Sequence, residues 1–298
     1  MMKKTQRGEA AAVKQTVKAY AKINLALDVL GKREDGYHEL CMVMQTVSLC
    51  DELEIAPAER GFAFYTDGSF TPKGEKTLEQ QAAEAFFGAI DRPVPPMEVT
   101  LHKVTPPYAG LGGGSADVAA LLRALRAEYA PKMADEELEA IGLSVGSDMP
   151  FCIRGGTALA EGRGEKLTDL PPLMPCWIVI CKPDFGISTP TIFARADSCQ
   201  LTCRPDIAGM MTALETQNRA ALADSVRNVL EEALAEEQGE VFTIKRRLLE
   251  LGADAAAMSG SGPAVFGLFW QKEPAQDAAK VLKEVYRETF LAQPVGKF

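Results

Sequence analysis

The fold of this chain is decided by one stretch of its sequence, Pro106-Pro107-Tyr108-Ala109-Gly110-Leu111-Gly112-Gly113-Gly114-Ser115-Ala116-Asp117. Four glycines within five positions do not suit a helix interior or a strand, because glycine loses the most backbone freedom on ordering. Such a backbone can turn tightly and let a ligand approach its N–H groups. Apolar residues at helical spacing follow the loop, and Ser115 is expected to cap the helix that they predict. These apolar residues are Ala119, Leu121, Leu122 and Leu125.

A glycine loop that leads into a helix predicts an anion site. The first-turn N–H groups lack helical partners, and the helix N-terminus carries about half a positive charge. We therefore expect this loop to hold phosphate groups. A P-loop would end in Lys-Ser or Lys-Thr, which Gly114-Ser115-Ala116 lacks. A dinucleotide-binding fold needs a second strand after the helix, whereas residues 135–143 have the pattern of another helix. A loop that only connects a strand to a helix stays open as the alternative.

Composition limits the class of protein. The chain has 298 residues, 47% hydrophobic and 24% charged, which is ordinary for a globular protein of two domains. Its net charge of −9 disfavours nucleic acids and anionic membranes, because both require a basic surface. No apolar run approaches the roughly 18 residues that span a bilayer, and residues 1–15 do not resemble a signal peptide. Seven cysteines without a C-x-x-C pair indicate reduced thiols, so we expect a cytoplasmic protein.

Two segments of the first half carry candidate binding residues. Apolar and polar residues alternate from Val17 to Val29, which predicts a half-buried strand with Lys22 and Asn24 on its polar face. Lys22 either serves a site or is solvated, as most strand lysines are. Tyr37 and His38 stand between a charged loop and a predicted strand, where they could contact a planar ligand. An edge aromatic beside a histidine with a structural partner is equally open.

A carboxylate and a second glycine loop stand out further along. Asp148 lies in Gly146-Ser147-Asp148-Met149-Pro150-Phe151, on a turn ahead of a proline. It is either a turn-capping residue or a carboxylate presented to a ligand. The second glycine loop is Met258-Ser259-Gly260-Ser261-Gly262-Pro263.

The remaining pattern predicts an α+β organisation. We expect further strands at 41–49, 51–55, 61–65, 99–104, 177–181 and 264–270. We expect helices at 78–90, 207–236, 241–251 and 275–291, and a loop at 67–76. Pro171-Pro172 predicts a domain boundary. The expected division is a flexible extension over 1–16, a domain with the first glycine loop over 17–172 and a second domain over 173–298.

Several motifs together resemble those of the GHMP kinase superfamily. The three superfamily motifs match Ala21–Leu25, Pro106–Asp117 and Met258–Gly262. Within the superfamily, the diphosphocytidyl-methylerythritol kinases have segments that resemble Gly36–Leu40, Gly146–Phe151 and Gly162–Glu165 of this chain. The resemblance implies a two-domain α+β GHMP kinase fold. Its N-terminal domain would be like domain 2 of ribosomal protein S5, its C-terminal domain would be ferredoxin-like, and the active site would lie between them.

The resemblance also implies a reaction and its residues. The reaction is ATP-dependent phosphorylation of the 2-hydroxyl of 4-diphosphocytidyl-2-C-methyl-D-erythritol, a step of non-mevalonate isoprenoid precursor synthesis, with Mg²⁺ accompanying ATP. Lys22 and Asp148 match the catalytic pair, and no protein ligand of the metal is assigned. The ATP phosphate loop matches Pro106, Pro107, Tyr108, Ala109, Gly110, Leu111, Gly112, Gly113, Gly114, Ser115 and Ala116. Substrate contacts match Asn24, Tyr37, His38, Thr189 and Phe193, with Phe193 closing over the cytosine opposite Tyr37.

Some residues depart from the family pattern, and other functions stay open. Tyr108 replaces a usually small residue, and Lys76-Thr77 stands where an asparagine is common. One alternative is another GHMP-type kinase, acting on homoserine, mevalonate or a sugar. The other is a non-catalytic nucleotide- or RNA-binding module, which the net acidity and the presence of both Lys22 and Asp148 disfavour. The sequence makes no prediction of the oligomeric state.

Overall fold

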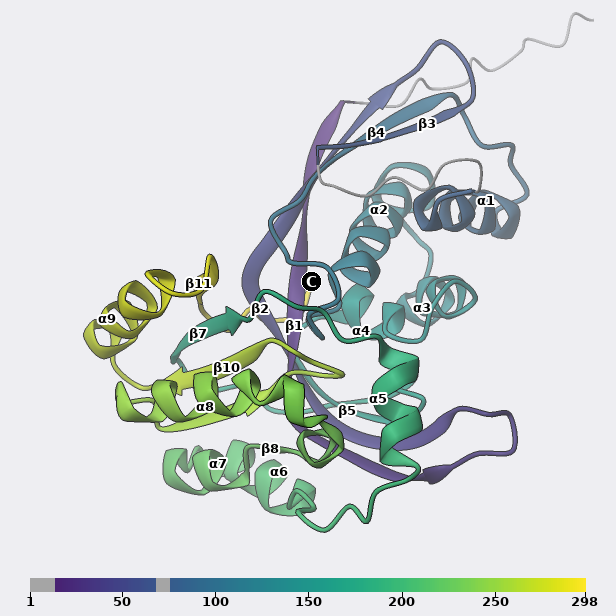
Figure 1. Ribbon diagram of the computed structural model, residues 1–298. Helices are drawn as coiled ribbons and strands as arrows, with labels where there is room; N and C mark the ends of the chain where they lie inside the picture. The colour runs from purple at the N-terminus through teal and green to yellow at the C-terminus, as the bar shows by residue number, and fades with distance from the viewer. Residues whose placement is uncertain (1–13, 68–75) are drawn as a thin grey trace, which may run out of the picture.

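The structure is a computed structural model, and it describes residues 14–67 and 76–298. Two β-sheets with their covering helices make up the described chain (Figure 1). Most of the predicted extension and of the predicted loop at 67–76 lies outside the described residues. The extension ends earlier than expected, because Gln15 and Thr16 already pair with the second strand.

The first sheet is built around two long strands. β1 (Gln15–Lys32) and β2 (His38–Pro57) pair antiparallel over most of their length. The other strands are β3 (Phe62–Thr66), β4 (Met97–His102), β5 (Thr157–Gly162), β6 (Lys166–Asp169) and the two-residue β8 (Arg227–Asn228). Their order is β3-β4-β2-β1-β8, and β5 pairs with β2 and β6. The prediction of two strands at 41–49 and 51–55 was wrong. β2 is continuous, because its second edge pairs first with β5 and then with β4.

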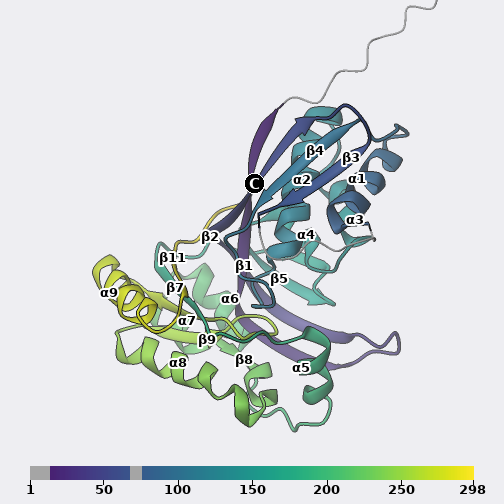
Figure 2. The same cartoon turned by 45° about the horizontal axis from the view of Figure 1, so that its top comes forward.

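Four helices cover one face of the first sheet (Figures 1 and 2). They are α1 (Leu78–Ala89), α2 (Gly113–Tyr129), α3 (Asp135–Leu143) and α4 (Met149–Arg154). α2 packs on β1 and β2, and its buried residues include the predicted apolar face. The predicted cap is corrected: Gly112, with φ +66°, is the N-cap, and the helix begins at Gly113. Ser115 therefore lies within the first turn.

The second sheet has the strand order of a ferredoxin-like domain, which confirms that prediction. It contains β7 (Trp177–Lys182), β9 (Ala255–Met258), β10 (Val265–Phe269) and β11 (Glu288–Ala292), in the order β11-β7-β10-β9. Its helices α8 (Glu240–Glu250) and α9 (Lys272–Lys283) pack on these strands. The segment between β7 and α8 also contains α5 (Thr189–Ala196), α6 (Ile207–Glu215), α7 (Arg219–Ser225) and the 3₁₀ turns η1 (Val229–Ala233) and η2 (Glu236–Gln238).

Two predicted helices were too long. The helix expected at 275–291 ends at Lys283, and residues 288–292 form β11, which pairs with β7. The helix expected at 207–236 is α6, α7, β8 and η1. Asparagine side chains cause two of its interruptions, because Asn218 caps α7 and Asn228 caps η1. β9 and α4 were not predicted.

β1 is buried on both faces between residues 21 and 29, so the prediction of a half-buried strand was wrong. On one face, Ile23 belongs to the same apolar cluster as Phe266 of the second sheet. The other face carries Lys22 and Asn24 and lies against the glycine loop. Asn24 is fully buried there. Two polar side chains are therefore enclosed at the junction between the two sheets.

Candidate active site

Lys22 is a buried cation at the centre of this junction. Its ammonium donates to Asn24 Oδ1 at 2.8 Å and lies 3.7 Å from Asp148 Oδ2. The interpretation of Lys22 as a solvated strand residue was wrong, because the residue is 5% exposed. Its aliphatic stem runs against the glycine loop: a Cβ at Gly112 would lie 2.9 Å from Lys22 Cγ. The charge is thus fixed in a dry position beside the loop.

Asp148 occupies the N-cap position of α4. Within the described part of the chain its side chain makes no capping hydrogen bond to α4, so Asp148 is not the side-chain cap of that helix. The carboxylate instead points toward Lys22, and it is 35% exposed. A Cβ at Gly164, in the turn between β5 and β6, would lie 3.8 Å from Asp148 Oδ1. A partly exposed carboxylate beside a buried cation can accept a proton from a bound hydroxyl or orient it.

The glycine loop presents the first turn of α2. The first helical hydrogen bond runs from Ala116 N to Gly112 O at 2.8 Å. The N–H groups of Gly113, Gly114 and Ser115 therefore precede the helical hydrogen-bond ladder. A Cβ at Gly114 would meet no atom within 4 Å, so this side of the loop is open. Open N–H groups at the start of a 17-residue helix can bind an anion.

The second glycine loop supports the first one. Ser259 Oγ donates to Gly110 O at 2.9 Å, and Ala264 N donates to Ala109 O at 3.1 Å. Gly110 has φ +75°, and a Cβ there would lie 2.0 Å from the carbonyl oxygen of Ser259. The close approach of the two backbones therefore requires glycine at this position.

Asn228 holds the second glycine loop and was missed by the sequence analysis. Its side-chain amide donates to Met258 O and to Gly260 O, both at 2.8 Å. The residue is buried in the short strand β8, which pairs with β1. No motif surrounds Asn228, so only the three-dimensional structure reveals this contact.

A buried ion cluster beside the first glycine loop was also missed. This loop, Pro106–Asp117, is called the phosphate loop below. Lys103 Nζ contacts Asp51 Oδ2 at 2.6 Å and Asp117 Oδ2 at 2.8 Å. Asp51 Oδ1 also accepts from the backbone N–H groups of Val104 and Thr105, both at 2.6 Å. Burial raises the pKa of Asp117 well above its usual range, and the Lys103 charge opposes that rise. The cluster ties the end of β4 and the start of α2 to β2.

Tyr108 gives the phosphate loop a bulky, exposed residue. It has φ +52° and is 67% exposed, and a Cβ at Gly186 would lie 2.9 Å from Tyr108 Cβ. A non-glycine residue with positive φ is strained. Tyr108 therefore joins the phosphate loop to the segment that leads into α5.

The predicted substrate residues divide into two contacts. The His38 ring contacts that of Phe193 with centroids 4.7 Å apart and planes at 30°, and its Nε2 lies 2.7 Å from Asp197 Oδ1. Tyr37 is 52% exposed, and the Arg163 guanidinium lies 4.8 Å from its ring centroid. The placement of Phe193 opposite Tyr37 across a cytosine stays a prediction.

Thr189 and Asn24 link the predicted substrate contacts to the second glycine loop. The hydroxyls of Thr189 and Ser261 are hydrogen-bonded at 3.0 Å. The backbone N–H of Asn24 donates to Ser259 Oγ at 3.3 Å. The structure therefore brings Lys22, Asn24 and Asp148 together with the phosphate loop, and it connects α5 to the same loops.

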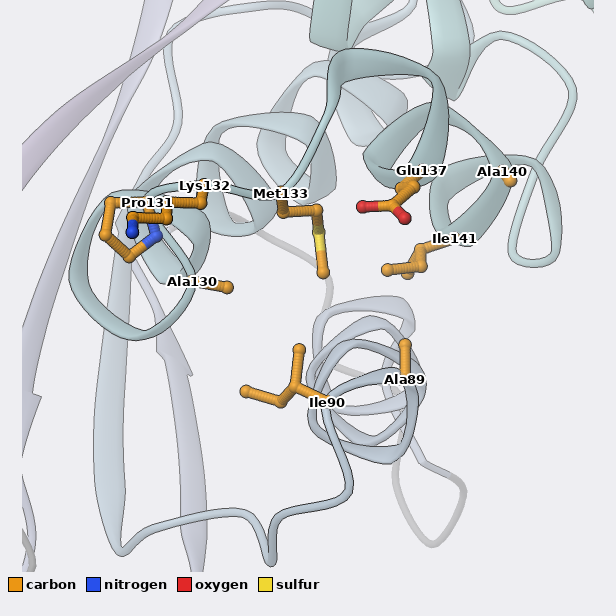
Figure 3. A pocket seen from close by; sticks show the side chains of 9 residues that line it. All are labelled: Ala89, Ile90, Ala130, Pro131, Lys132, Met133, Glu137, Ala140 and Ile141. Atoms are coloured by element: carbon orange, nitrogen blue, oxygen red, sulfur yellow. The ribbon is translucent and has the colours of Figure 1, made fainter.

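A hollow of about 790 Å³ lies elsewhere (Figure 3). It is lined by Ala89, Ile90, Ala130, Pro131, Lys132, Met133, Glu137, Ala140 and Ile141. Ala130 follows the last residue of α2, whereas the phosphate loop precedes its first. A helix of 17 residues is about 25 Å long, so the Ala130 end of this hollow is far from the glycine loop.

Comparisons with known proteins identify the family. The model of the GHMP kinases N terminal domain matches residues 77–156, and that of GHMP kinases C terminal matches residues 210–288. A 4-diphosphocytidyl-2-C-methyl-D-erythritol kinase of Clostridium botulinum (strain Kyoto / Type A2) is 40% identical over 280 residues. This alignment covers 93% of the chain and 99% of the relative. The chain belongs to the 4-diphosphocytidyl-2-C-methyl-D-erythritol kinase family.

Solved structures agree with this membership of the 4-diphosphocytidyl-2-C-methyl-D-erythritol kinase family. A crystal structure of 4-(cytidine 5'-diphospho)-2C-methyl-D-erythritol kinase superposes with a TM-score of 0.79 and is 31% identical, covering 95% of this chain and all of that one. Homoserine kinase from Cytophaga hutchinsonii, at 18% identity and a TM-score of 0.70 over 98% of each chain, shares the fold. The predicted fold and the prediction of a small-molecule kinase are confirmed.

Within residues 14–67 and 76–298, no helix has the length and apolar character needed to cross a membrane.

Proposed function

We propose that this protein transfers the γ-phosphoryl group of ATP to the 2-hydroxyl of 4-diphosphocytidyl-2-C-methyl-D-erythritol, a step of non-mevalonate isoprenoid precursor synthesis. The relatives' names support the substrate, since their alignments cover 93% of the chain. The observation that carries the mechanism is the pairing of buried Lys22 with Asp148 at 3.7 Å, beside the open first turn of α2.

The phosphate loop binds and orients ATP. Phosphoryl transfer depends mainly on positioning and on neutralising charge, with little covalent chemistry for the protein. The N–H groups of Gly113, Gly114 and Ser115 and the dipole of α2 attract the β- and γ-phosphates. Ser259 and Lys103 keep this loop in place from two sides, through Gly110 and Asp117.

Lys22 and Asp148 act on the transferred group and the acceptor. Lys22 is held by Asn24, so its charge is already oriented toward the oxygens that become more negative during transfer. Asp148 accepts or orients the proton of the acceptor hydroxyl, a role typically worth about 10²–10⁴ in rate.

The chain suits a magnesium ion that arrives with ATP. In the described residues no group of three or more His, Cys, Asp or Glu side chains could hold a metal ion. Mg²⁺ is commonly bound through substrate phosphates, waters and one or two carboxylates. We therefore expect the ion to be held mainly by the ATP phosphates and water, with no protein ligand assigned. Mg²⁺ would supply neutralisation of phosphate charge.

The cytidine end of the substrate is proposed to bind at α5. Tyr37, His38 and Phe193 offer three rings for a base, and Thr189 offers a hydroxyl near Ser261.

All seven cysteines are free thiols, which supports the proposed cytoplasmic location. We propose a division near residue 172, with the first part beginning at Gln15 and the site between the two parts.

The test is ADP release with Mg·ATP and each of three acceptors: 4-diphosphocytidyl-2-C-methyl-D-erythritol, homoserine and mevalonate. We expect turnover with the cytidine compound alone, and loss of that turnover in Asp148→Asn. Turnover with homoserine or mevalonate would contradict the proposed substrate while retaining the kinase chemistry. ATP binding without turnover of any acceptor would favour a non-catalytic nucleotide-binding module.

A further inference from the structure

The last six residues of the chain, 293–298, return from the second sheet to the first. We call this segment the tail. Ser48 N donates to Gln293 O at 2.8 Å, and Val295 N donates to Thr46 O at 2.9 Å. Pro294 forms an antiparallel bridge with Val47 of β2. Figure 1 accordingly marks the C-terminus beside β1 and α2, away from α9. The tail therefore extends along β2 after leaving β11.

The end of the tail packs on α4, the helix that begins after Asp148. Phe298 N donates to Arg154 O, at the C-terminal end of α4, at 3.2 Å. Gly155 has φ +71°, and a Cβ there would lie 2.7 Å from the Phe298 ring. A Cβ at Gly156 would lie 3.0 Å from Lys297 Cγ. Two consecutive glycines thus make room for the tail directly behind α4.

The same phenylalanine ring contacts the strand that carries Lys22. Phe298 stacks on Tyr20 of β1, with centroids 5.6 Å apart and planes at 16°. On β1, Tyr20 precedes Lys22 by two residues, and the β1–β2 register shifts between them. One ring therefore lies against both elements that hold the candidate catalytic pair.

Arg123 of α2 completes this contact. Its guanidinium carbon lies 4.1 Å from the centroid of the Phe298 ring. It also donates to Cys152 O in α4 and to Lys18 O in β1. The stacked ring and the guanidinium together fasten α4 to β1 at the end remote from Asp148.

We propose that the tail positions Asp148 against Lys22, with Phe298 as the positioning residue. α4 has only six residues, so a shift of its C-terminal end also moves its first residue. The 3.7 Å separation between Lys22 and Asp148 is not fixed by a direct hydrogen bond between them. Beside the packing of α4 on α2 and α3, the contacts of Phe298 with Tyr20 and Arg154 hold α4 in place relative to β1. The inference rests on the proposed catalytic roles of Lys22 and Asp148.

The test compares kcat, both KM values and the thermal unfolding midpoint of the full chain with variants of Phe298. Phe298→Ala removes the ring, Phe298→Leu keeps apolar bulk in case the alanine variant fails to fold, and Phe298→Tyr keeps the ring. Phe242→Ala on α8 is the matched control, since Phe242 is 47% exposed and Phe298 is 46% exposed. We expect Phe298→Ala and Phe298→Leu to lower kcat about tenfold or more, because misplacement by 1 Å can cost about 10²-fold. KM for ATP should stay within about twofold of the wild-type value in all three variants. The kcat of Phe298→Tyr should remain close to that of the wild type, because the ring is kept.

A second measurement separates positioning from general loss of structure. If the tail acts through Asp148, adding Phe298→Ala to Asp148→Asn should lower kcat no further. The inference would be overturned if the fold-losses in kcat of the two single variants multiplied in the double variant. It would also be overturned if Phe298→Ala and Phe242→Ala lowered kcat equally. The proposed function is tested separately, by turnover of the wild type and its loss in Asp148→Asn. If both are observed but Phe298→Leu has the kcat of the wild type, the proposed function stands and only the role of the tail is refuted.

Discussion

Ser259 Oγ donates its hydrogen to the carbonyl oxygen of Gly110 at 2.9 Å, across 149 positions of the sequence. Ser259 Oγ also accepts a hydrogen bond from Asn24 N at 3.3 Å. One hydroxyl thus connects the two glycine loops and the strand of Lys22. The position of the phosphate loop relative to the buried lysine depends on this hydrogen-bonded group.

Replacing Ser259 should loosen the phosphate loop. Ser259→Ala leaves the Asn24 N–H and the Gly110 carbonyl without this partner, at a cost of about 1–3 kcal/mol. We expect KM for ATP to rise and the urea unfolding midpoint to fall. Ser198→Ala, at an exposed serine after α5, is the control. Equal ATP kinetics and equal midpoints for the two variants would contradict the contact's role.

Gly110→Ala should be more damaging than the loss of the serine. The new Cβ would lie 2.0 Å from the Ser259 carbonyl oxygen, and φ is +75° at this position. The two glycine loops must then separate, so we expect ATP affinity to fall strongly, as measured by calorimetry. Gly88→Ala provides the control, since its Cβ meets nothing within 4 Å and alanine favours a helix by about 1 kcal/mol. Retained ATP affinity in Gly110→Ala would mean that the loops tolerate separation.

Asp148→Asn should separate chemistry from nucleotide binding. The amide keeps the size of the side chain but cannot take a proton from the acceptor, so kcat should fall by about 10²–10⁴. ATP affinity should change little, because Asp148 does not contribute to the α2 anion site. Steady-state ADP release and ATP titration measure the two quantities. The exposed Asp277→Asn in α9 is the control, and unchanged kcat in Asp148→Asn would refute the assignment.

Tyr37→Ala should act on the cytidine substrate. The ring is 52% exposed and has an Arg163 guanidinium on one face, so a base can stack on it. Loss of one stacking contact costs about 1–3 kcal/mol, which predicts a rise in KM of about 5- to 150-fold. KM for ATP should not change. An effect confined to ATP would show that the cytosine binds elsewhere.

Stability should depend on Glu232 at acidic pH. A hydrogen bond with the Cys203 side chain and one from the Thr202 N–H lower the pKa of Glu232 from 4.5 to about 2. Since the folded-state pKa is the lower one, the carboxylate stabilises the protein above pH 4.5, and this contribution disappears as pH falls toward 2. Glu232→Gln should therefore lower the unfolding midpoint at pH 7. The difference from the wild type should shrink below pH 4.5, unlike that of the exposed Glu236→Gln. A difference independent of pH would exclude this carboxylate as the cause.

Local conformation made the glycine loops predictable. Gly110 and Gly112 have positive φ and lie against other backbone or side-chain atoms, so glycine is required there and the sequence signals the loop directly. The start of α2 was predicted less well. Gly112 is the cap and not Ser115, because positive φ ends the loop three residues earlier than the side-chain rule suggests.

Tertiary packing decided the features that the sequence did not predict. The alternation around Lys22 resembles that of a half-exposed strand, and only the second sheet and the phosphate loop enclose it. Residues 288–292 continue an apparent helical pattern, yet they form β11 because β7 offers them an edge. Asn228 and Lys103 act across distant segments, so no local pattern identified them.

The contacts of β8 and the tail also bear on the synthesis of the chain. The first sheet receives Arg227–Asn228 beside β1 and residues 294–298 beside β2 and α4, although its other strands end at Asp169. A nascent chain that has emerged only to residue 172 thus has β1 with an uncovered edge and α4 without its tail. A chain that folds from its N-terminus therefore cannot complete the first sheet before residues 227–228 and 294–298 have been made, so β1 and α4 are expected to reach their final packing late.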